Sequence, residues 1–198
     1  MKITLAQAKK LITLARDAIS AYFKGKEPVI TDSLKKEFKE KQGAFVSLYL
    51  KDELNGCIGI TGPDLPLYKT IIHCAKAAAF EDPRFPPLKK TQLRDTKIEI
   101  SILTVPEPIE LKKDPSEYLK AIKIGRDGLL VKDEFGQGLL LPQVAVEWKW
   151  DVKEFLNQTC AKAGLDFDCW NNMRRNVYKF QAQVFAEKGN SVIEKKLK

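Results

Sequence analysis

Hydrophobic and polar residues recur with a helical period at the start of this chain. Thr4 and Gln7 form a capping-box pattern that predicts the first turn of a helix. Apolar residues then follow at helical spacing, at Leu5, Ala8, Leu11, Ile12, Ala15, Ile19 and Phe23. The pattern predicts an amphipathic helix up to about Phe23, and we expect a short helical turn from Asp32 to Glu40.

The run AFVSLYLKDELNGCIGI, residues 44–60, has the period of two that is typical of strands. One face would carry Phe45, Ser47 and Tyr49, and the other Val46, Leu48 and Leu50. Residues 51–53 have the composition of a turn. The segment therefore predicts a β-hairpin whose second strand contains LNGCIGI.

The remaining patterns predict further helices and strands. Helices are expected over residues 66–80, 115–121, 142–148 and 151–164, the last with Asp151 as N-cap, Glu154 completing the cap, and Gly164 after its end. Strands are expected in TKIEISILTVPEPI, in a hairpin over 124–141, and as one strand over 176–187. The tail EKKLK is expected to be disordered. Strands in hairpins with interspersed helices predict an α+β fold, a mainly antiparallel sheet flanked by helices.

Composition and charge restrict the class of protein. At 198 residues and 44% hydrophobic, the chain suits one domain or two subdomains. Its formal charge of +8 favours an acidic partner such as nucleic acid, a nucleotide or an acidic protein, although stretches like SLKKEFKEK are also typical of a solvated surface. No stretch approaches the roughly 18 apolar residues of a membrane span. We expect a cytoplasmic protein with no membrane segment.

The four cysteines, Cys57, Cys74, Cys160 and Cys169, contain no CxxC pair, and the chain has one histidine, His73. A zinc site would have to be assembled without any local pairing of ligands, so no metal is expected. Disulfides are rare in a cytosolic protein of this size. The spacing therefore predicts four free thiols, with all but Cys57 as small core residues.

Cys57 lies between Gly56 and Gly59 and has two interpretations. A thiol becomes nucleophilic beside a cation or a helix N-terminus, which Arg84 and the helix starting near Pro66 would supply. Alternatively, Cys57 is a small buried residue, and the glycines allow the helical residues 77–79 to pack closely.

Two other segments carry candidate chemistry. In EDPRFPPL, prolines stiffen a loop that projects Arg84 and Phe85, and the guanidinium suits a carboxylate or phosphate; Asp82 and Arg84 would otherwise pair and tie the loop to the sheet. In LLLPQVAVEWKWD, Glu147 and Asp151 are an acid–base pair if they converge, and caps or ion pairs if they do not. The tryptophans Trp148 and Trp150 either wall a pocket or fill an interface. GxGxxG, GxxxxGK[ST], HExxH and GxSxG are absent.

Five separated segments resemble a known family in their order along nearly the whole chain. They are LNGCIG, AAAFEDPRFPPL, IEISILTVPEPI, LLLPQVAVEWKWDVKEFLNQTCAKAGL and YKFQAQVF. This order is similar to that of the AMMECR domain family, named for the Alport syndrome, midface hypoplasia and elliptocytosis chromosomal region. The resemblance implies one domain over 1–198 with a RAGNYA-like fold, in which a larger subdomain holds both termini and a smaller one is inserted roughly within 110–165. The family's usual LRGCIG stretch has Asn55 in place of arginine here.

The resemblance also implies a site in a cleft between the subdomains. The matching positions are Gly56, Cys57, Gly59, Asp82, Arg84, Phe85, Pro86, Pro142, Glu147 and Asp151. No reaction is established for the family, and no cofactor is implied. In bacteria and archaea such domains are associated with Memo-type and radical-SAM proteins, which implies a shared modification pathway.

Two hypotheses follow. In the first, the cleft binds a small or anionic ligand and the protein is an enzyme, with Arg84 orienting the ligand and Cys57 as nucleophile or Glu147 as acid–base group. In the second, the protein is a non-catalytic module that binds nucleic acid, a nucleotide or a peptide.

Overall fold

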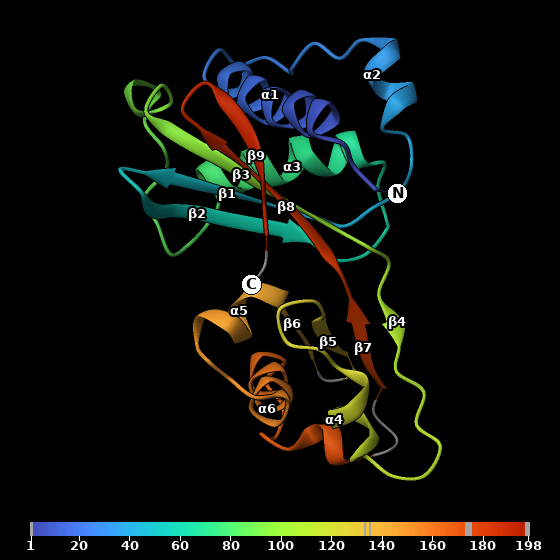
Figure 1. Ribbon diagram of the computed structural model, residues 1–198. Coiled ribbons are helices and arrows are strands. Elements are labelled where there is room, and N and C mark those ends of the chain that lie inside the picture. Colours follow the sequence, from blue (N-terminus) through green and yellow to red (C-terminus); the bar gives the residue numbers. More distant parts are fainter. Residues whose placement is uncertain (1, 133, 135, 173–175, 197–198) are drawn as a thin grey trace. The chain divides into compact units, whose positions relative to one another are not determined.

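The computed structural model describes residues 2–132, 134, 136–172 and 176–196 (Figure 1). The chain forms two compact units, and each is considered by itself. Unit 1 comprises Met1–Leu103 with Gln183–Lys195, and unit 2 comprises Thr104–Ala182 with Lys196–Lys198. No helix within the described residues is long and apolar enough to cross a membrane.

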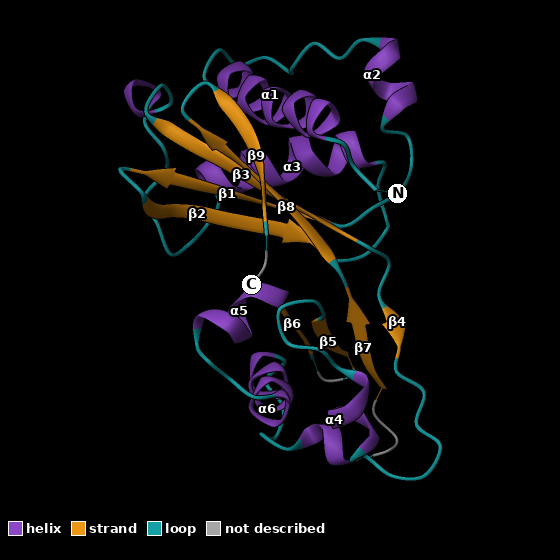
Figure 2. Ribbon diagram, in the orientation of Figure 1, coloured by secondary structure: helices purple, strands orange, loops and turns teal. Residues whose placement is uncertain are grey.

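Unit 1 consists of a five-stranded sheet with helices on one face (Figure 2). Its helices are α1 (Leu5–Tyr22), α2 (Asp32–Glu37), α3 (Leu67–Phe80) and the 3₁₀ turn η1 (Lys90–Gln92). Its strands are β1 (Ala44–Leu50), β2 (Glu53–Ile60), β3 (Thr96–Leu103), β8 (Ala182–Lys188) and β9 (Ser191–Lys195), in the order β2-β1-β3-β8-β9. The sheet leaves β2 and β9 as its edges.

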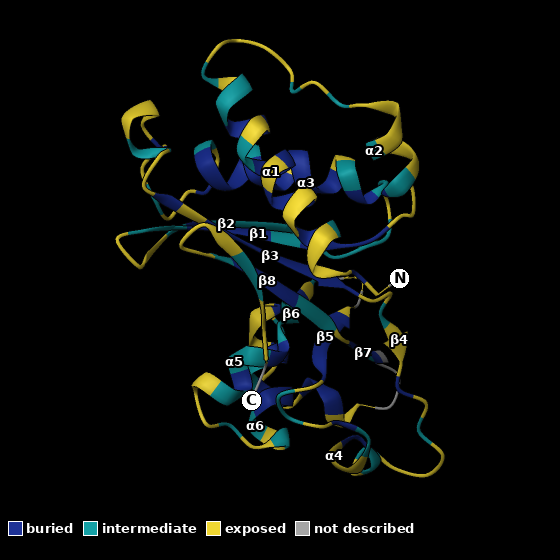
Figure 3. Ribbon diagram, turned by 45° about the horizontal axis from the view of Figure 1, so that its top comes forward, coloured by how far each residue is buried: buried dark blue, intermediate teal, exposed yellow. Residues whose placement is uncertain are grey.

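The core of unit 1 lies between this sheet and helices α1 and α3. Thr4 and Gln7 form the predicted capping box, so α1 begins where the sequence indicates. In β1, Val46 and Leu48 are fully buried in the same cluster as the apolar faces of both helices. Figure 3 shows α3, β1 and β3 largely in the colour of buried residues. Because side chains alternate along a strand, Ser47 faces the opposite side of the sheet from this core.

The described residues of unit 2 form a four-stranded sheet and three helices. The strands are β4 (Glu107–Pro108), β5 (Gly128–Lys132), β6 (Gln137–Leu140) and β7 (Asn176–Phe180), in the order β4-β7-β5-β6. The helices are α4 (Glu117–Ala121), α5 (Pro142–Glu147) and α6 (Val152–Lys162), with the 3₁₀ turn η2 (Cys169–Asn171). Helix α6 packs on β5 and β6 around a separate core that includes Phe155 and Leu156. The predicted α+β fold with antiparallel pairing is confirmed.

The prediction of one strand over 176–187 is wrong. The chain forms β7 and β8, which belong to different sheets, with Gln181 between them. At this point the Gln181 N–H donates to Thr104 Oγ1, and Thr104 N–H donates to the Gln181 carbonyl. The alternating pattern continues through both strands because each has one face on a core, so the pattern contains no sign of the change of sheet.

The tail is also more ordered than predicted. Glu194 and Lys195 belong to β9, where Lys195 is paired with Val184 of β8. The last two residues of EKKLK, 197 and 198, lie outside the described residues. Short polar edge strands lack the apolar alternation that identifies central ones, which explains the error.

The prediction of four free thiols is wrong for two of them. Cys160 at the end of α6 and Cys169 in η2 form a disulfide, with 5.8 Å between their Cα atoms. Gly164 adopts a positive φ of 73° directly after α6, so the chain reverses and brings η2 back to the helix. The linear spacing of nine residues does not show this reversal. Cys57 and Cys74 are free.

Candidate functional site

The loop after α3 binds the backbone of Cys57 on the edge strand β2. In an antiparallel pair, alternate residues turn their N–H and C=O groups away from the partner strand. At Cys57 the N–H donates to Asp82 Oδ2 at 2.8 Å, and the carbonyl accepts from Arg84 Nη2 at 3.0 Å. Side chains of the loop therefore take the place that a further strand would occupy.

Asp82 and Arg84 also form an ion pair with each other. Arg84 Nε donates to Asp82 Oδ1 at 3.0 Å, and Nη2 donates to Oδ2 at 2.8 Å. The Asp82 side chain is fully buried, whereas that of Arg84 is 56% exposed. Hydrogen bonding by the guanidinium holds the pKa of Asp82 well below its usual range and raises that of Arg84. Of the two interpretations of this loop, pairing and a tie to the sheet are therefore present.

Two neighbours of Arg84 complete the exposed side of the loop. The guanidinium carbon of Arg84 lies 5.3 Å from the centroid of the Phe85 ring, within the range of a cation–π contact. Phe85 is partly exposed and Pro86 is exposed. The loop thus presents a cation and an apolar ring side by side.

The Cys57 thiol belongs to a polar row that crosses the sheet on the face opposite the helices. Ser47 of β1 lies directly opposite Cys57 of β2 and Glu99 of β3. Ser47 Oγ donates to Cys57 Sγ at 3.2 Å, and Lys195 Nζ of β9 lies 2.5 Å from Glu99 Oε2. The row brings a thiol, a hydroxyl, a carboxylate and an ammonium group together from four strands.

Ser47, Glu99 and Lys195 were not among the residues predicted from the sequence. Glu99 is a single acidic residue between the buried isoleucines of β3, and Ser47 is on the more polar side of the alternation in β1. Those two signals were present in the sequence. Lys195 had no such signal because β9 was not predicted.

The predicted helix N-terminus does not lie beside Cys57. A Cβ atom on Gly56 would lie 2.0 Å from the carbonyl oxygen of Ala78, in the last turns of α3. Since a helix rises about 1.5 Å per residue, its first turn is roughly 15 Å away. The strand next to Cys57 therefore meets the carbonyl end of the helix, which has no free N–H groups to offer a thiolate.

Packing explains both glycines of LNGCIG. Gly56 allows the approach of Ala78, and a Cβ atom on Gly59 would lie 2.2 Å from the Phe45 ring. Cys74 is fully buried, and burial raises the pKa of its thiol to about 12. Its neighbour His73 is exposed, on a different face of α3. Cys57 is the half-buried thiol of unit 1 and Cys74 the core one.

The three other predicted site residues belong to unit 2. Pro142 is the buried first residue of α5, and Glu147 is its exposed last residue. Asp151 caps α6 by accepting the N–H of Glu154 at 2.8 Å. The Glu154 carboxylate accepts a hydrogen bond from Gln158 Nε2 at 2.7 Å. For Asp151, the structure shows the capping role that was one of its two interpretations.

A break separates Glu147 from Asp151. Lys149 has a positive φ of 55°, and the N–H of Trp150 donates to the carbonyl of Ala145 at 2.9 Å. This is the Schellman arrangement that ends a helix, so the two acidic residues do not share one helical face. Trp148 is 68% exposed, and its ring stacks on Trp150 with 6.0 Å between centroids.

Among the described residues, no group of three or more His, Cys, Asp and Glu side chains is arranged to hold a metal ion. The chemistry that unit 1 offers beside Cys57 is that of a thiol, an exposed guanidinium and their hydrogen-bonding partners.

Comparison with known proteins identifies relatives over nearly the full length. The sequence model of the AMMECR1 family matches residues 12–185. A protein of Methanothermobacter thermautotrophicus is 45% identical over 184 residues, which are 92% of this chain and 95% of that protein. A protein of Methanocaldococcus jannaschii is 46% identical over 199 residues, 98% of each chain. The crystal structure of an uncharacterized protein from Pyrococcus horikoshii has 43% identity and a TM-score of 0.92 over 100% of both chains.

Proposed function

The chain belongs to the AMMECR1 family, and from that premise we propose that it binds a small anionic ligand beside Cys57, where Arg84 recognises the ligand and Cys57 supplies a reactive thiol. The observation that carries this proposal is the 3.0 Å hydrogen bond from Arg84 Nη2 to the Cys57 carbonyl. It keeps an exposed guanidinium next to a free, half-buried thiol.

The donors of Arg84 support recognition of an anion. A guanidinium has five N–H donors, and the bonds to Asp82 and to the Cys57 carbonyl use those of Nε and Nη2. Within the part of the chain that the structure describes, no hydrogen bond uses the Nη1 donors, which are therefore available to a ligand oxygen. Since Asp82 balances the charge of Arg84, most of the affinity would come from directed hydrogen bonds, and we expect weak, millimolar to micromolar binding.

The surroundings of the thiol support a reactive group. Ser47 holds Cys57 Sγ through its hydroxyl, which fixes the direction of the thiol and would stabilise a thiolate by donating to it. Phe85 and Pro86 would provide the apolar side of the ligand site. In unit 2, taken by itself, the exposed Glu147 at the end of α5 is the proposed acid–base group, and Pro142 and Asp151 are proposed ligand-binding residues.

The test is the rate at which iodoacetamide alkylates Cys57 in the folded protein, with inorganic phosphate as the anionic probe. Phosphate should slow alkylation, and Arg84→Gln should remove this protection, whereas Lys39→Gln, which changes an exposed lysine elsewhere, should retain it. Ser47→Ala should lower the alkylation rate without phosphate. A thiol that reacts only after unfolding would contradict the reactive role of Cys57, and equal protection in Arg84→Gln would contradict recognition by Arg84.

Asn55 allows a test in the opposite direction. The family resemblance places arginine at this position, so Asn55→Arg adds a cation two residues before Cys57. We expect stronger protection by phosphate and faster alkylation in its absence. Asn55→Gln is the matched control, because it lengthens the side chain without adding charge, and it should behave like the unchanged protein.

A non-catalytic binding module is the alternative, and Trp148 is the observation that favours it. Base stacking on exposed aromatic rings supports single-strand binding, and Trp148 is 68% exposed on a parallel Trp150 ring. A fluorescent single-stranded RNA of mixed sequence should then bind to the protein. Its affinity should fall as the salt concentration rises, and Trp148→Ala should bind it more weakly. If the partner is instead a Memo-type or radical-SAM protein, its complex with this protein should persist as the salt concentration rises. Absence of binding to the RNA would leave the ligand proposal as the better one.

A further inference from the structure

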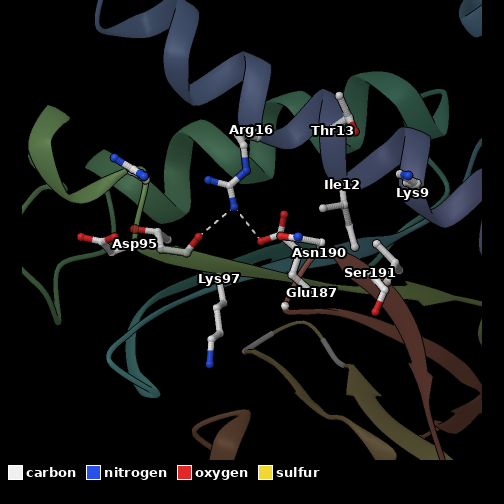
Figure 4. Close-up of a pocket in the computed structure, with 13 residues that line it drawn as sticks. Lys9, Ile12, Thr13, Arg16, Asp95, Lys97, Glu187, Asn190 and Ser191 are labelled. Carbon is white, nitrogen blue, oxygen red and sulfur yellow. Dashed lines mark hydrogen bonds and ion pairs between the residues drawn. The ribbon is translucent and has the colours of Figure 1, made fainter.

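A pocket of unit 1 lies apart from the residues around Cys57. It has a volume of about 640 Å³ and is formed by α1, the segment 94–97 and the turn between β8 and β9 (Figure 4). Small-molecule sites typically enclose about 300–1,000 Å³. The pocket has no residue in common with the polar row or with the loop that carries Asp82 and Arg84.

Arg16 fixes the walls of this pocket relative to one another. From α1 it donates to the carbonyls of Leu93 and Thr96, each at 2.8 Å, and to Glu187 Oε2 at 2.6 Å. Glu187 Oε2 also accepts the N–H of Ile98 at 2.8 Å. Figure 4 shows Arg16 reaching from α1 towards Glu187. A helix, β3 and β8 are therefore tied by one side chain, and the pocket is largely preformed.

The charges that remain in the pocket are mainly positive. Arg16 is paired with Glu187, and Lys97 is paired with Asp52 at 2.5 Å. Lys9 and Arg94 are exposed and have no ion pair with any residue that the structure describes. Asp95 is the one acidic lining residue outside these pairs. With two cations and one carboxylate outside the ion pairs, the lining favours an anionic ligand.

The remaining lining residues indicate which kind of molecule would carry the anionic groups. Lys9, Thr13 and Arg16 occupy one face of α1 over two helical turns, roughly 10 Å, with Ile12 between them. Ile12 is 3% exposed and Val192 is partly buried, so the floor is apolar. Thr13, Asn190 and Ser191 supply hydroxyl and amide groups at the rim. The lining suits a molecule with an apolar body and anionic groups.

We propose that this pocket is a second ligand site, which binds a small organic anion carrying phosphate or carboxylate groups. Lys9 and Arg94 bind the charged groups, and the body of the ligand lies over Ile12. The site is independent of the ligand proposed beside Cys57, since the two have no residue in common.

Binding is tested by NMR titration of the full chain with phenyl phosphate and with phthalate, two compact doubly charged anions with flat apolar bodies. Benzyl alcohol is the uncharged control. Amide signals of residues 189–192 and of the α1 face should shift with the anions and not with the alcohol. Tighter binding of phenyl phosphate would assign a phosphate ester, and tighter binding of phthalate a dicarboxylate; either result supports the site.

Substitutions of lining residues test whether the ligand binds in this pocket. Lys9→Gln and Arg94→Gln should each weaken binding about threefold to fivefold, as expected for an exposed charge contact. Lys36→Gln, an exposed lysine of α2 that does not line the pocket, should leave affinity unchanged. Alkylation of Cys57 should also leave it unchanged. The proposal is overturned if neither anion shifts these signals, or if Lys36→Gln weakens binding as much as Arg94→Gln.

Discussion

The buried carboxylate of Asp82 accepts the backbone N–H of Cys57 at 2.8 Å, so a side chain from the loop after α3 completes the hydrogen bonding of the edge strand β2. Exposed edge strands invite pairing with other chains. Arg84 covers the other backbone group of the same residue, because its Nη2 donates to the Cys57 carbonyl. The pair protects the strand and fixes the backbone that carries the thiol.

Replacing Asp82 by asparagine should destabilise the protein in a pH-dependent way. The pKa of Asp82 is depressed in the folded state, so its contribution is complete above the unfolded value of about 3.9 and is lost as pH falls towards the folded value. Asp82→Asn should lower the free energy of unfolding by about 2–3 kcal/mol at pH 7. Urea titrations at pH 7 and pH 3 should show a smaller difference at pH 3; an equal difference would contradict the ionised role of Asp82.

Alkylation in three steps should distinguish the accessible, the buried and the disulfide-bonded cysteines. In the folded protein at pH 8, iodoacetamide should modify Cys57 alone, because Cys74 is fully buried with a pKa raised to about 12. In denaturant without reductant, mass spectrometry should find two modified residues, and after reduction four, because Cys160 and Cys169 are bonded. Four modified residues without reductant would show that the disulfide is absent.

Gly56→Ala should be more destabilising than Gly25→Ala. The new Cβ atom at position 56 would lie 2.0 Å from the backbone oxygen of Ala78, which can move only if α3 shifts from the sheet. We expect a loss of about 3 kcal/mol in the free energy of unfolding. At Gly25 nothing lies within 4 Å, and only its φ of 64° opposes alanine, which costs about 1–2 kcal/mol. Thermal unfolding compares the two, and similar losses would contradict the close contact.

Arg16 and Glu187 should show strong energetic coupling. A double-mutant cycle with Arg16→Gln and Glu187→Gln should give a coupling energy of about 1–2 kcal/mol, because both side chains are partly buried and each is held by a further hydrogen bond, Arg16 to the Thr96 carbonyl and Glu187 to the Ile98 N–H. The matched cycle uses Lys10→Gln and Glu37→Gln, whose 2.7 Å ion pair is more exposed. That cycle should give less than about 0.5 kcal/mol. Equal coupling in the two cycles would show that the Arg16–Glu187 pair does not tie α1 to β8.

The sequence by itself determined the local elements and the family. Helix α1 begins at its predicted capping box and the β1–β2 hairpin follows its period of two, because capping and alternation depend on residues a few positions apart. The five segments that resemble the family, and their order along the chain, could also be recognised from the sequence alone. Arg84 and Cys57 were also identified from the sequence as candidate site residues.

Only the tertiary structure decided which residues meet. Ser47 and Glu99 align with Cys57 because β2, β1 and β3 are neighbours in the sheet, and Lys195 reaches Glu99 from β9. Cys160 meets Cys169 because the chain reverses after α6. The carbonyl end of α3, and not its N-terminus, lies at Gly56 for the same kind of reason. Contacts between distant segments depend on strand order and on the direction in which a helix crosses the sheet, and no local pattern encodes either.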